Sequence, residues 1–283
     1  MIRLSLKNIR YRYTGVNASD RWILDDVSLE IGPDECVALV GPSGSGKTTL
    51  IQHFTGLLKP AEGEISWNGE NIWASHFKQN ILRKKVGIVF QFPESQLFEE
   101  TVAKDVAFGP QNLGVRGEDI DRTVDEALRT VHLDPQEVSS RSPFRLSEGE
   151  KRRVAIAGVL AMNPDLVVFD EPTAGLDPVG VRLMATIVHG LLAKNQSVVV
   201  VTHNMDFVAD VCSRVVLLSE GSIHFDGRPG ELFANKELLQ RTGLDLPALV
   251  TALHELKMAI PEEMRNCISL QQLEEKLDQT FLS

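Results

Sequence analysis

The chain has 283 residues, of which 43% are hydrophobic and 24% charged, a composition typical of globular proteins with buried cores. Its 39 acidic and 29 basic residues give a formal net charge of −10, so the overall field disfavours nucleic acid as a partner. No apolar run approaches the roughly 18 residues of a membrane span, and the N-terminus lacks a signal-peptide core. Three widely spaced cysteines favour reduced thiols over disulfides or a metal site. We therefore expect a cytoplasmic protein, held at a membrane only through a partner.

The first 31 residues alternate apolar and polar positions and predict two or three strands. Tyr11 and Tyr13 fall on one face of the first ribbon. An aromatic ring at Tyr13, shortly before the glycine-rich segment described next, is suited to stacking on an adenine ring. The alternative, in which both tyrosines only cover the sheet, is equally consistent with the pattern.

A glycine-rich segment, GPSGSGKTT at residues 41–49, follows a continuous apolar run at residues 37–40 and leads into apolar positions at helical spacing. This is the strand, loop and helix order of a P-loop, in which backbone N–H groups converge on phosphate oxygens at a helix N-terminus. Lys47 adds a positive charge for the β- and γ-phosphates, and Thr48 offers a hydroxyl to Mg²⁺. The predicted nucleotide-binding residues of this loop are Gly41, Pro42, Ser43, Gly44, Ser45, Gly46, Lys47, Thr48 and Thr49.

Residues 63–72 predict a pair of strands with a turn between them, and residues 86–90 predict a further strand that ends at Gln91. In a P-loop fold, a polar side chain at the carboxyl end of a strand lies where ligands bind, although Gln91 is also an ordinary strand-end residue. From about residue 93 to residue 162 the pattern becomes helical. We expect a helical subdomain to be inserted there.

A helix with a basic first turn is predicted within residues 145–163, after the tetrapeptide LSEG. Lys151, Arg152 and Arg153 oppose the helix dipole there, because the N-terminus of a helix is its positive end. Either an anionic partner or a solvated helix face would explain these three residues.

Two further strands end in residues suited to phosphate chemistry. Residues 165–170 predict a buried strand that ends in Asp170 and Glu171, and residues 197–202 predict another that ends at His203. Strands alternate with helices along the chain, which predicts a largely parallel α/β sheet. The carboxyl ends of parallel strands line one crevice, so these side chains and the P-loop should meet there.

The predicted chemistry at that crevice is phosphoryl transfer from a nucleotide to water. Asp170 would hold Mg²⁺, directly or through water, and Glu171 would orient or deprotonate the attacking water. Asp177 with Pro178 begins the helix between the two strands. No residue pattern marks the acceptor site that a kinase would need.

Beyond about residue 229 the pattern is helical and separate from the sheet. Two apolar stripes define the predicted helices, Leu249, Val250, Leu253 and Leu256 after Pro247, and Leu270, Leu273, Leu277 and Phe281 after a capping box of Ser269 and Gln272. Such stripes need to be covered. Packing on the chain's own domain and dimerisation satisfy that need equally well.

Six segments in this order resemble the motif set of an ABC ATPase. They are the Walker A motif at 41–49, the Q-loop Gln91, the signature LSEGEKRR at 146–153, the Walker B motif at 166–172, the D-loop AGLD at 174–177 and the switch histidine at 202–203. The resemblance covers residues 1–228 and implies an α/β P-loop NTPase with a RecA-like parallel-sheet core and an inserted helical subdomain. Residues 229–283 would form a C-terminal helical extension.

The resemblance also implies a role for each site residue. ATP would be held by the P-loop, with Thr48, Gln91 and Asp170 attending Mg²⁺. Glu171 would be the catalytic base and His203 would contact the γ-phosphate.

Three more residues would act across an interface, because two cassettes of this family pack head to tail. Ser147 and Gly149 would bind the ATP held by a partner cassette, and Asp177 would cross the interface between the two.

Segments 51–60, 89–110, 154–165 and 242–253 resemble, more narrowly, the ATPase subunits of energy-coupling factor transporters, importers of vitamins and transition-metal ions. That resemblance implies a second ATPase subunit, identical or related, a transmembrane energy-coupling subunit and a separate substrate-binding membrane subunit. The protein would sit on the cytoplasmic side of the cell membrane, with no nucleic-acid partner.

Two other functions remain open on the motifs alone, the ATPase of another ABC transporter and a non-transport regulatory ABC ATPase. A chromosome-maintenance ATPase would separate its motifs by long coiled coils, whereas Lys47 and Ser147 are only 100 residues apart (147 − 47). The signature departs from the usual LSGGQ, since Glu148 and Glu150 replace glycine and glutamine. Ser147 and Gly149 are retained, so we expect activity.

Overall fold

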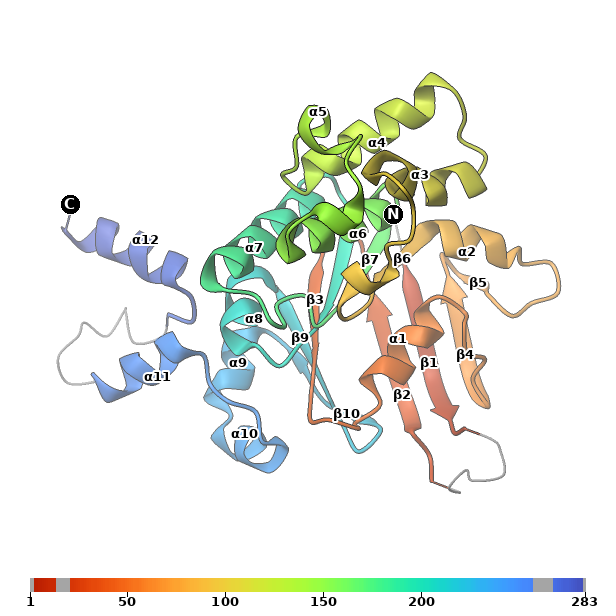
Figure 1. Cartoon of the computed structure of the whole chain (residues 1–283). Coiled ribbons are helices and arrows are strands. Elements are labelled where there is room, and N and C mark those ends of the chain that lie inside the picture. The colour runs from red at the N-terminus through yellow and green to blue at the C-terminus, as the bar shows by residue number, and fades with distance from the viewer. Residues whose placement is uncertain (1–2, 14–20, 257–266, 282–283) are drawn as a thin grey trace.

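The computed structural model describes residues 3–13, 21–256 and 267–281, in which helices flank a central sheet (Figure 1). Its six-stranded sheet has the order β10-β9-β3-β8-β7-β6, parallel except for the final hairpin of β9 and β10. The strands are β3 (Cys36–Val40), β6 (Val86–Val89), β7 (Leu166–Asp170), β8 (Ser197–Val201), β9 (Arg214–Ser219) and β10 (Ser222–Gly227). The carboxyl ends of β3, β6, β7 and β8 therefore point to one edge, as the sequence predicts.

Both faces of this sheet are buried, which is why its inner strands are continuous apolar runs. Along β3, Cys36, Ala38 and Val40 belong to the apolar core on one face, whereas Val37 and Leu39 belong to the core on the opposite face. A strand with only one covered face would have alternated apolar and polar residues.

A second, antiparallel sheet lies against one of these faces, with the strand order β2-β1-β4-β5. Its strands are β1 (Leu4–Tyr11), β2 (Leu24–Ile31), β4 (Glu62–Trp67) and β5 (Glu70–Asn71), and the neighbouring helices are α1 (Lys47–Phe54) and α2 (Gln79–Lys85). Helix α1 buries Leu50, Ile51 and Phe54 between the two sheets. The loop that precedes α1 is thereby fixed on a rigid base.

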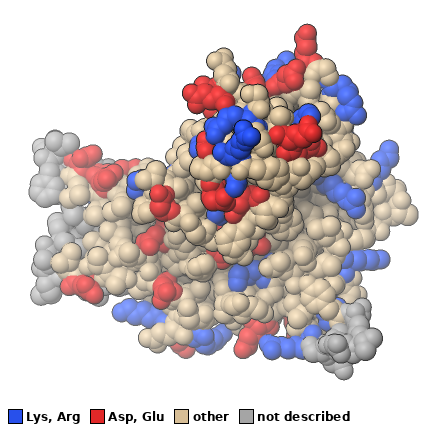
Figure 2. Space-filling model, viewed as in Figure 1, with Lys and Arg blue, Asp and Glu red and all other residues tan. Residues whose placement is uncertain are grey.

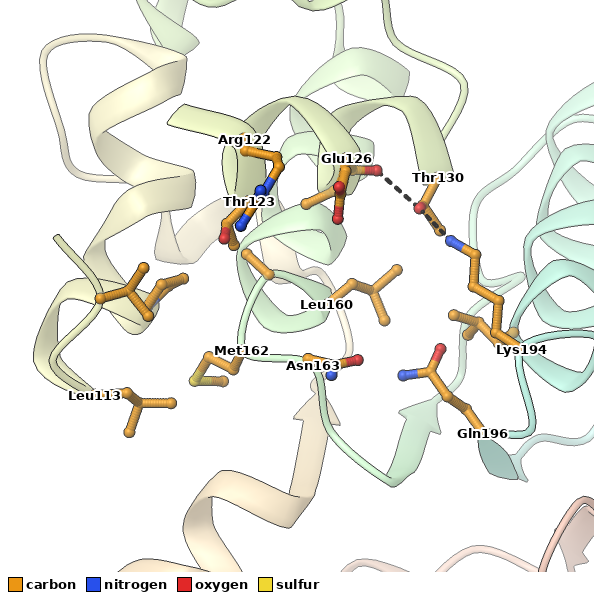
Figure 3. Close-up of a pocket in the computed structure, with 15 residues that line it drawn as sticks. Leu113, Arg122, Thr123, Glu126, Thr130, Leu160, Met162, Asn163, Lys194 and Gln196 are labelled. Carbon is orange, nitrogen blue, oxygen red and sulfur yellow. Dashed lines mark hydrogen bonds between the residues drawn. The ribbon is translucent and has the colours of Figure 1, made fainter. Parts of the chain in front are cut away.

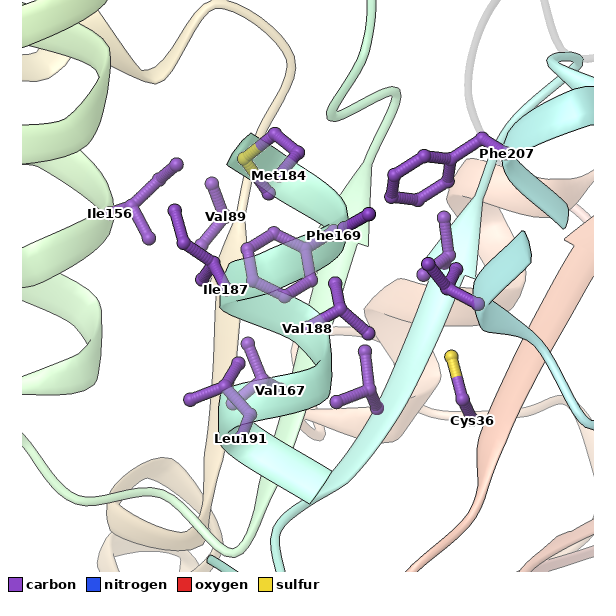
Figure 4. Close-up of a cluster of buried hydrophobic side chains, with 14 of the residues drawn as sticks. Cys36, Val89, Ile156, Val167, Phe169, Met184, Ile187, Val188, Leu191 and Phe207 are labelled. Atoms are coloured by element: carbon purple, nitrogen blue, oxygen red, sulfur yellow. The ribbon is translucent and has the colours of Figure 1, made fainter. Parts of the chain in front are cut away.

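The other face is covered by α7 (Pro178–Leu192) and α8 (Met205–Val211). Figure 4 shows Phe169 of β7 enclosed with Ile187 and Val188 of α7, and all three side chains are at most 1% exposed. Fully burying a side chain of this size contributes about 1.5–3 kcal/mol relative to exposure. This packing fixes the residues that directly follow β7.

A helical subdomain lies above the sheet in Figure 1, between β6 and β7 in the chain. It consists of the 3₁₀ helices η1 (Pro93–Gln96) and η2 (Pro143–Arg145) with α3 (Val102–Asn112), α4 (Glu118–Thr130), α5 (Pro135–Val138) and α6 (Glu148–Leu160). Acidic and basic side chains lie side by side over it in Figure 2. Several are ion pairs within one helix, such as Arg122 with Asp119 at 2.8 Å.

Among the described residues, the C-terminal helices are α9 (Pro229–Ala234), α10 (Lys236–Thr242), α11 (Ala248–Glu255) and α12 (Leu270–Phe281). The first part packs back on the chain's own domain, where Leu232 and Phe233 join the main core and Asp206 accepts a hydrogen bond from the backbone N–H of Ala248 at 2.8 Å. By contrast, Leu270 at the start of α12 is 66% exposed. The predicted stripes are thus covered in part.

Two details of the C-terminal prediction differ in the structure. The side chain of Gln272 accepts from the N–H of Ile268 at 3.0 Å, one residue before the expected Ser269, although the Ser269 hydroxyl does accept from the N–H of Gln272 at 3.4 Å. Leu256 lies beyond the end of α11 and is 51% exposed, because the helix stops at Glu255. The side chain of Phe281 lies outside the described residues.

The prediction of a basic first turn is wrong, because α6 begins at Glu148 and its first turn carries Glu148 and Glu150, with Lys151, Arg152 and Arg153 following. The position of Arg152 is explained by contacts that the sequence did not reveal. Arg152 is buried, and its guanidinium donates to the backbone carbonyls of Glu171, Pro172 and Ala174. Arg152 is therefore neither a solvated surface residue nor a binding site for an anionic partner.

Within the part of the chain that the structure describes, no helix is long and apolar enough to cross a membrane.

Candidate active site

The glycine-rich loop between β3 and α1 passes so close to other backbone that two of its residues must be glycine. Gly41 has φ 145°, and a Cβ atom there would lie 1.9 Å from the carbonyl oxygen of Leu218. Gly46 has φ 103°, and a Cβ atom there would lie 2.9 Å from the carbonyl oxygen of Ile23. The loop can therefore adopt its closed curve at the N-terminus of α1 only without these side chains.

Lys47 folds back over the loop that precedes it. Its Nζ donates to the carbonyl oxygens of Gly41 and Pro42, each at 2.8 Å. Burial lowers the pKa of Lys47, and the charges of Glu171 and Asp170 oppose that shift. Because an ammonium group has three N–H donors, one is left to reach a phosphate oxygen.

Asp170 and Glu171 follow each other at the carboxyl end of β7. Burial raises the pKa of Asp170, the neighbouring Glu171 raises it further, and Lys47 acts in the opposite direction. Glu171 has a left-handed backbone with φ 50°, and its N–H donates to the carbonyl of Val201 at 2.8 Å. Backbone strain of this kind is concentrated at functional sites, where the surrounding structure holds it in place.

The Glu171 carboxylate is itself held by two donors from the end of β8. The Thr202 hydroxyl donates to Oε2 at 3.2 Å, and Nδ1 of His203 lies 2.9 Å from Oε1. Since an ionised carboxylate only accepts, Nδ1 of His203 carries the proton in this contact. The His203 side chain is otherwise 76% exposed, so its Nε2 is free to meet a ligand.

A cavity of about 410 Å³ joins the loop to the acidic pair. Of the residues predicted from the sequence, Tyr13, Ser43, Gly44, Gly46, Lys47, Thr48, Thr49, Gln91, Asp170 and Glu171 line it. Ile23 and Val201 complete the lining and were not predicted as site residues. Gly41, Pro42, Ser45 and His203 are not part of this lining. The carbonyls of Gly41 and Pro42 accept from Lys47, and His203 contacts Glu171.

Tyr13 lines the cavity and is 48% exposed. Its hydroxyl lies 3.2 Å from the Thr49 hydroxyl, and its ring meets Tyr11 edge-on at 5.2 Å between centroids. The hydroxyl end of the ring is therefore held while about half of the residue is accessible at the cavity, which suits stacking on a planar ring.

Oxygen donors suited to a hard divalent cation gather at the same cavity. The Thr48 hydroxyl, the Gln91 amide and the Asp170 carboxylate all line it. Mg²⁺ takes oxygen ligands and binds through one or two carboxylates together with phosphates. A cation here would also offset the unfavourable burial of the Asp170 carboxylate.

Ser147 and Gly149 lie apart from this cavity, at the exposed N-terminus of α6. Ser147 caps the helix: its hydroxyl accepts from the N–H of Glu150, and the Glu150 carboxylate accepts from the N–H and hydroxyl of Ser147. These bonds lower the pKa of Glu150, and they show that the glutamate which replaces the usual glutamine fills the same place in a capping box. Glu148 is exposed and pairs with Lys151 at 2.6 Å.

Asp177 also lies apart, at the N-terminus of α7. Its side chain is exposed and accepts from the N–H of Gly180 at 2.7 Å, as expected of a helix cap.

A second cavity, of about 360 Å³, lies between the helical subdomain and the core (Figure 3). There Lys194, beyond the end of α7, donates to the Thr130 hydroxyl of α4 at 2.9 Å. Asn163 and Gln196 line it just ahead of the amino ends of β7 and β8. It therefore lies at the opposite edge of the sheet from the strand ends where ligands bind in this kind of fold.

Known proteins share both the sequence and the fold. Residues 24–174 match the family described as ABC transporter. A protein of Clostridium tetani described as "Energy-coupling factor transporter ATP-binding protein EcfA2" is 40% identical over 279 residues, 98% of this chain and 97% of that protein. The chain belongs to the ABC transporter family. Within this family it stands with the ATP-binding proteins of energy-coupling factor transporters, and it hydrolyses ATP to energise transport.

Two solved structures of ABC proteins agree with this assignment. The structure of cbiO1 from Clostridium perfringens, described as part of the ABC transporter complex cbiONQ, has a TM-score of 0.75 at 36% identity and covers 89% of this chain and 98% of that one. A dimeric post-hydrolysis structure of the ATP-binding cassette MJ0796, bound to ADP and Pi, has a TM-score of 0.68 at 30% identity over 80% of this chain and 98% of that one. The predicted α/β P-loop fold with a helical subdomain is thereby confirmed.

Four residues in or around this site were not predicted as site residues, namely Ile23, Val201, Thr202 and Arg152. Thr202 could have been found, since it directly precedes the switch histidine at a strand end. Ile23 and Arg152 gave no local signal, because each reaches the site only through tertiary packing of a distant segment.

Proposed function

We propose that this ATPase works as one of a pair of cassettes beneath the membrane subunits of an energy-coupling factor importer, on the cytoplasmic side of the cell membrane. The imported solute would be a vitamin or a transition-metal ion, bound by a separate membrane subunit. One observation carries the proposal: the loop and acidic pair share one cavity, whereas Ser147 and Gly149 lie exposed elsewhere. A second cassette would bring the two halves together.

The exposed glycine of the signature supports this arrangement. Gly149 lies in the first turn of α6, and a Cβ atom there would have nothing within 4 Å. Glycine inside a helix costs roughly 0.5–1 kcal/mol relative to alanine. Nothing within the described part of the chain requires a glycine at position 149, so a close approach by the partner's ATP accounts for this glycine. Asp177 of this chain would lie at the same interface.

Hydrolysis would follow from the residues around the acidic pair. Glu171 accepts a proton from a water molecule as that oxygen bonds to the γ-phosphorus, and the bond from the γ-phosphorus to the bridging oxygen breaks. Lys47 stabilises charge on the β- and γ-phosphates through its remaining N–H. His203, with Nδ1–H on Glu171, contacts the γ-phosphate through Nε2 when the ring is doubly protonated. Tyr13 stacks on the adenine.

Thr48, Gln91 and Asp170 would hold Mg²⁺, which when bound draws charge from the phosphate oxygens. Gln91 thereby also connects the metal to the segment that follows it. That segment, residues 92–98, exposes Phe92 at 49% and Phe98 at 57%, and Phe98 stacks edge-on against the half-exposed Phe108. Such aromatic side chains suit the docking of a membrane subunit.

Replacing Gln96 with alanine tests this assignment of residues 92–98. Gln96 is exposed at the end of η1, so its loss should leave hydrolysis by the isolated chain within about twofold. In the complete complex in lipid vesicles, stimulation of hydrolysis by the membrane subunits should fall roughly 5- to 100-fold, the usual range of coupling between sites. Gln111→Ala, an exposed glutamine of α3 outside the segment, is the matched control. Full stimulation in the Gln96 variant would remove residues 92–98 from the docking site.

The cassette would comprise residues 1–228 and the extension residues 229–283, part of which would join two chains without nucleotide. Leu270 is the exposed apolar residue that begins α12, and burying one leucine contributes about 1.5–3 kcal/mol. Leu270→Glu should therefore weaken nucleotide-free dimerisation about tenfold or more, measured by sedimentation, while ATP binding is spared. The control is Leu57→Glu, at a leucine of the cassette that is 58% exposed, and it should leave dimerisation unchanged. Equal dimerisation in both variants would assign α12 to another role.

A further inference from the structure

Arg152 connects two segments that are far apart in the sequence and that the proposed mechanism uses separately. On one side, its Nη1 donates to the carbonyl of Ala174 at 2.7 Å, and its Nη2 donates to the carbonyls of Pro172 at 2.8 Å and Glu171 at 3.1 Å. These carbonyls belong to the turn that begins with the base. A planar guanidinium with several fixed donors can hold such a set, whereas a lysine ammonium is a point charge on a flexible stem.

Arg152 restrains the backbone of Glu171, a residue in an unfavourable conformation. Glu171 has φ 50°, which a side-chain-bearing residue rarely adopts unless its surroundings impose it. Val201 fixes its N–H, Arg152 fixes its carbonyl, and Thr202 with His203 fixes its carboxylate. Release of the carbonyl would let the backbone turn and carry the carboxylate away from the cavity.

On the other side, the charge of Glu94 acts on Arg152. Helix η1, which contains Glu94, packs against α6, which contains Arg152. Burial lowers the pKa of Arg152 and the charge of Glu94 raises it. Among the described residues, Oε2 of Glu94 is buried with no hydrogen-bond partner, so Glu94 acts on the guanidinium through its charge and not through a hydrogen bond from this oxygen.

We propose that Arg152 is a positioning residue for Glu171 and that the charge of Glu94 holds the Arg152 guanidinium in place. A movement of residues 92–98, which include Glu94, would then change the position of Glu171 through the Arg152 side chain. The inference rests on the proposed role of Glu171 as base. It adds the route by which the segment after Gln91 reaches the reaction. Arg152 itself lies outside the lining of the cavity and touches no reacting atom.

The test is a set of variants of the full chain with its partner cassette, assayed with ATP and Mg²⁺. Arg152→Lys keeps the positive charge but loses the fixed N–H donors of the planar guanidinium. The kcat should therefore fall about 10- to 100-fold, the usual effect of misplacing a catalytic group. KM for ATP should stay within about twofold, because the P-loop is untouched. Arg214→Lys is the control, a half-buried arginine that also donates to a backbone carbonyl, that of Glu30, at the far edge of the sheet. It should lower the unfolding temperature without lowering kcat.

Two double-variant comparisons separate positioning from general damage. In the Glu171→Gln background, Arg152→Lys should have no further effect, since there is no base left to position; a full additional loss there would overturn the inference. Glu94→Gln should lower kcat several-fold alone and add less than its full effect to Arg152→Lys, whereas Glu100→Gln, exposed and paired with Lys104, should change nothing.

The outcomes distinguish the proposed role of Glu171 as the base from the proposed role of Arg152 in positioning it. Near-normal turnover in Glu171→Gln alone would refute the role of Glu171, and with it the positioning of a base. Loss in Glu171→Gln with normal kcat in Arg152→Lys would refute only the inference. If Arg152→Lys does not fold, Glu94→Gln decides, because it leaves the buried guanidinium in place: an unchanged kcat contradicts the proposal and a lowered kcat at constant KM supports it.

Discussion

Replacing Glu171 with glutamine should lower ATP turnover by roughly 10²- to 10⁴-fold, the usual contribution of general-base catalysis. Glutamine keeps the shape of glutamate and can still bond to the Thr202 hydroxyl, which lies 3.2 Å from the carboxylate, but it cannot accept a proton from water. ATP affinity should barely change, because the phosphate-holding groups lie on the loop and not on β7. Steady-state hydrolysis and equilibrium binding of ATP measure the two quantities separately.

A matched control is available for this variant. Glu220 also has φ 50° and is exposed on the turn between β9 and β10. Glu220→Gln makes the same chemical change on the same kind of backbone away from the cavity, so its turnover should equal that of the parent. If Glu171→Gln keeps turnover within a few-fold of the parent, the base lies elsewhere, and His203 is the first residue to test.

Replacing Lys47 with alanine should instead weaken both binding and turnover. The lost hydrogen bond to a phosphate is charged and contributes about 1.5–3 kcal/mol, so ATP affinity should fall about 10- to 100-fold. Turnover at saturating ATP should fall as well, since charge that develops on the phosphates in the transition state loses its stabilisation.

The same two measurements distinguish this variant from the glutamine variant, which should lose turnover alone. Lys104→Ala removes an exposed lysine that pairs with Glu100 at 2.7 Å and should change neither quantity. Unchanged ATP affinity in Lys47→Ala would show that the ammonium stays on the carbonyls of Gly41 and Pro42 when the nucleotide binds.

The sheet and the phosphate loop could be predicted because their signals are local. Buried strands such as β7 and β8 are short continuous apolar runs, and the loop has glycines where the backbone passes within contact of Leu218 and Ile23. The convergence of Gln91, Asp170 and Glu171 on one cavity followed from a general rule, that parallel strands present their carboxyl ends at one edge.

The signals that failed were those that depend on tertiary contacts. Arg152 looks like a surface residue in the sequence, since nothing local shows that a turn 19 to 22 residues away along the chain supplies three carbonyl acceptors. The departure of the signature at Glu150 was also ambiguous, because glutamate closes a capping box as well as glutamine does. In both cases the sequence shows the residue type but not the groups to which its side chain is hydrogen-bonded.

The proposal that two cassettes close around ATP is tested most directly by sedimentation of the Glu171→Gln variant with ATP and Mg²⁺. Because the variant keeps the nucleotide between the cassettes, it should sediment as a complex with two cassettes, and this complex should separate when Mg²⁺ or ATP is withdrawn. Lys47→Ala under the same conditions should show no such nucleotide-dependent complex. A Glu171→Gln variant that remains a monomer at every protein concentration, with ATP bound, would contradict the account.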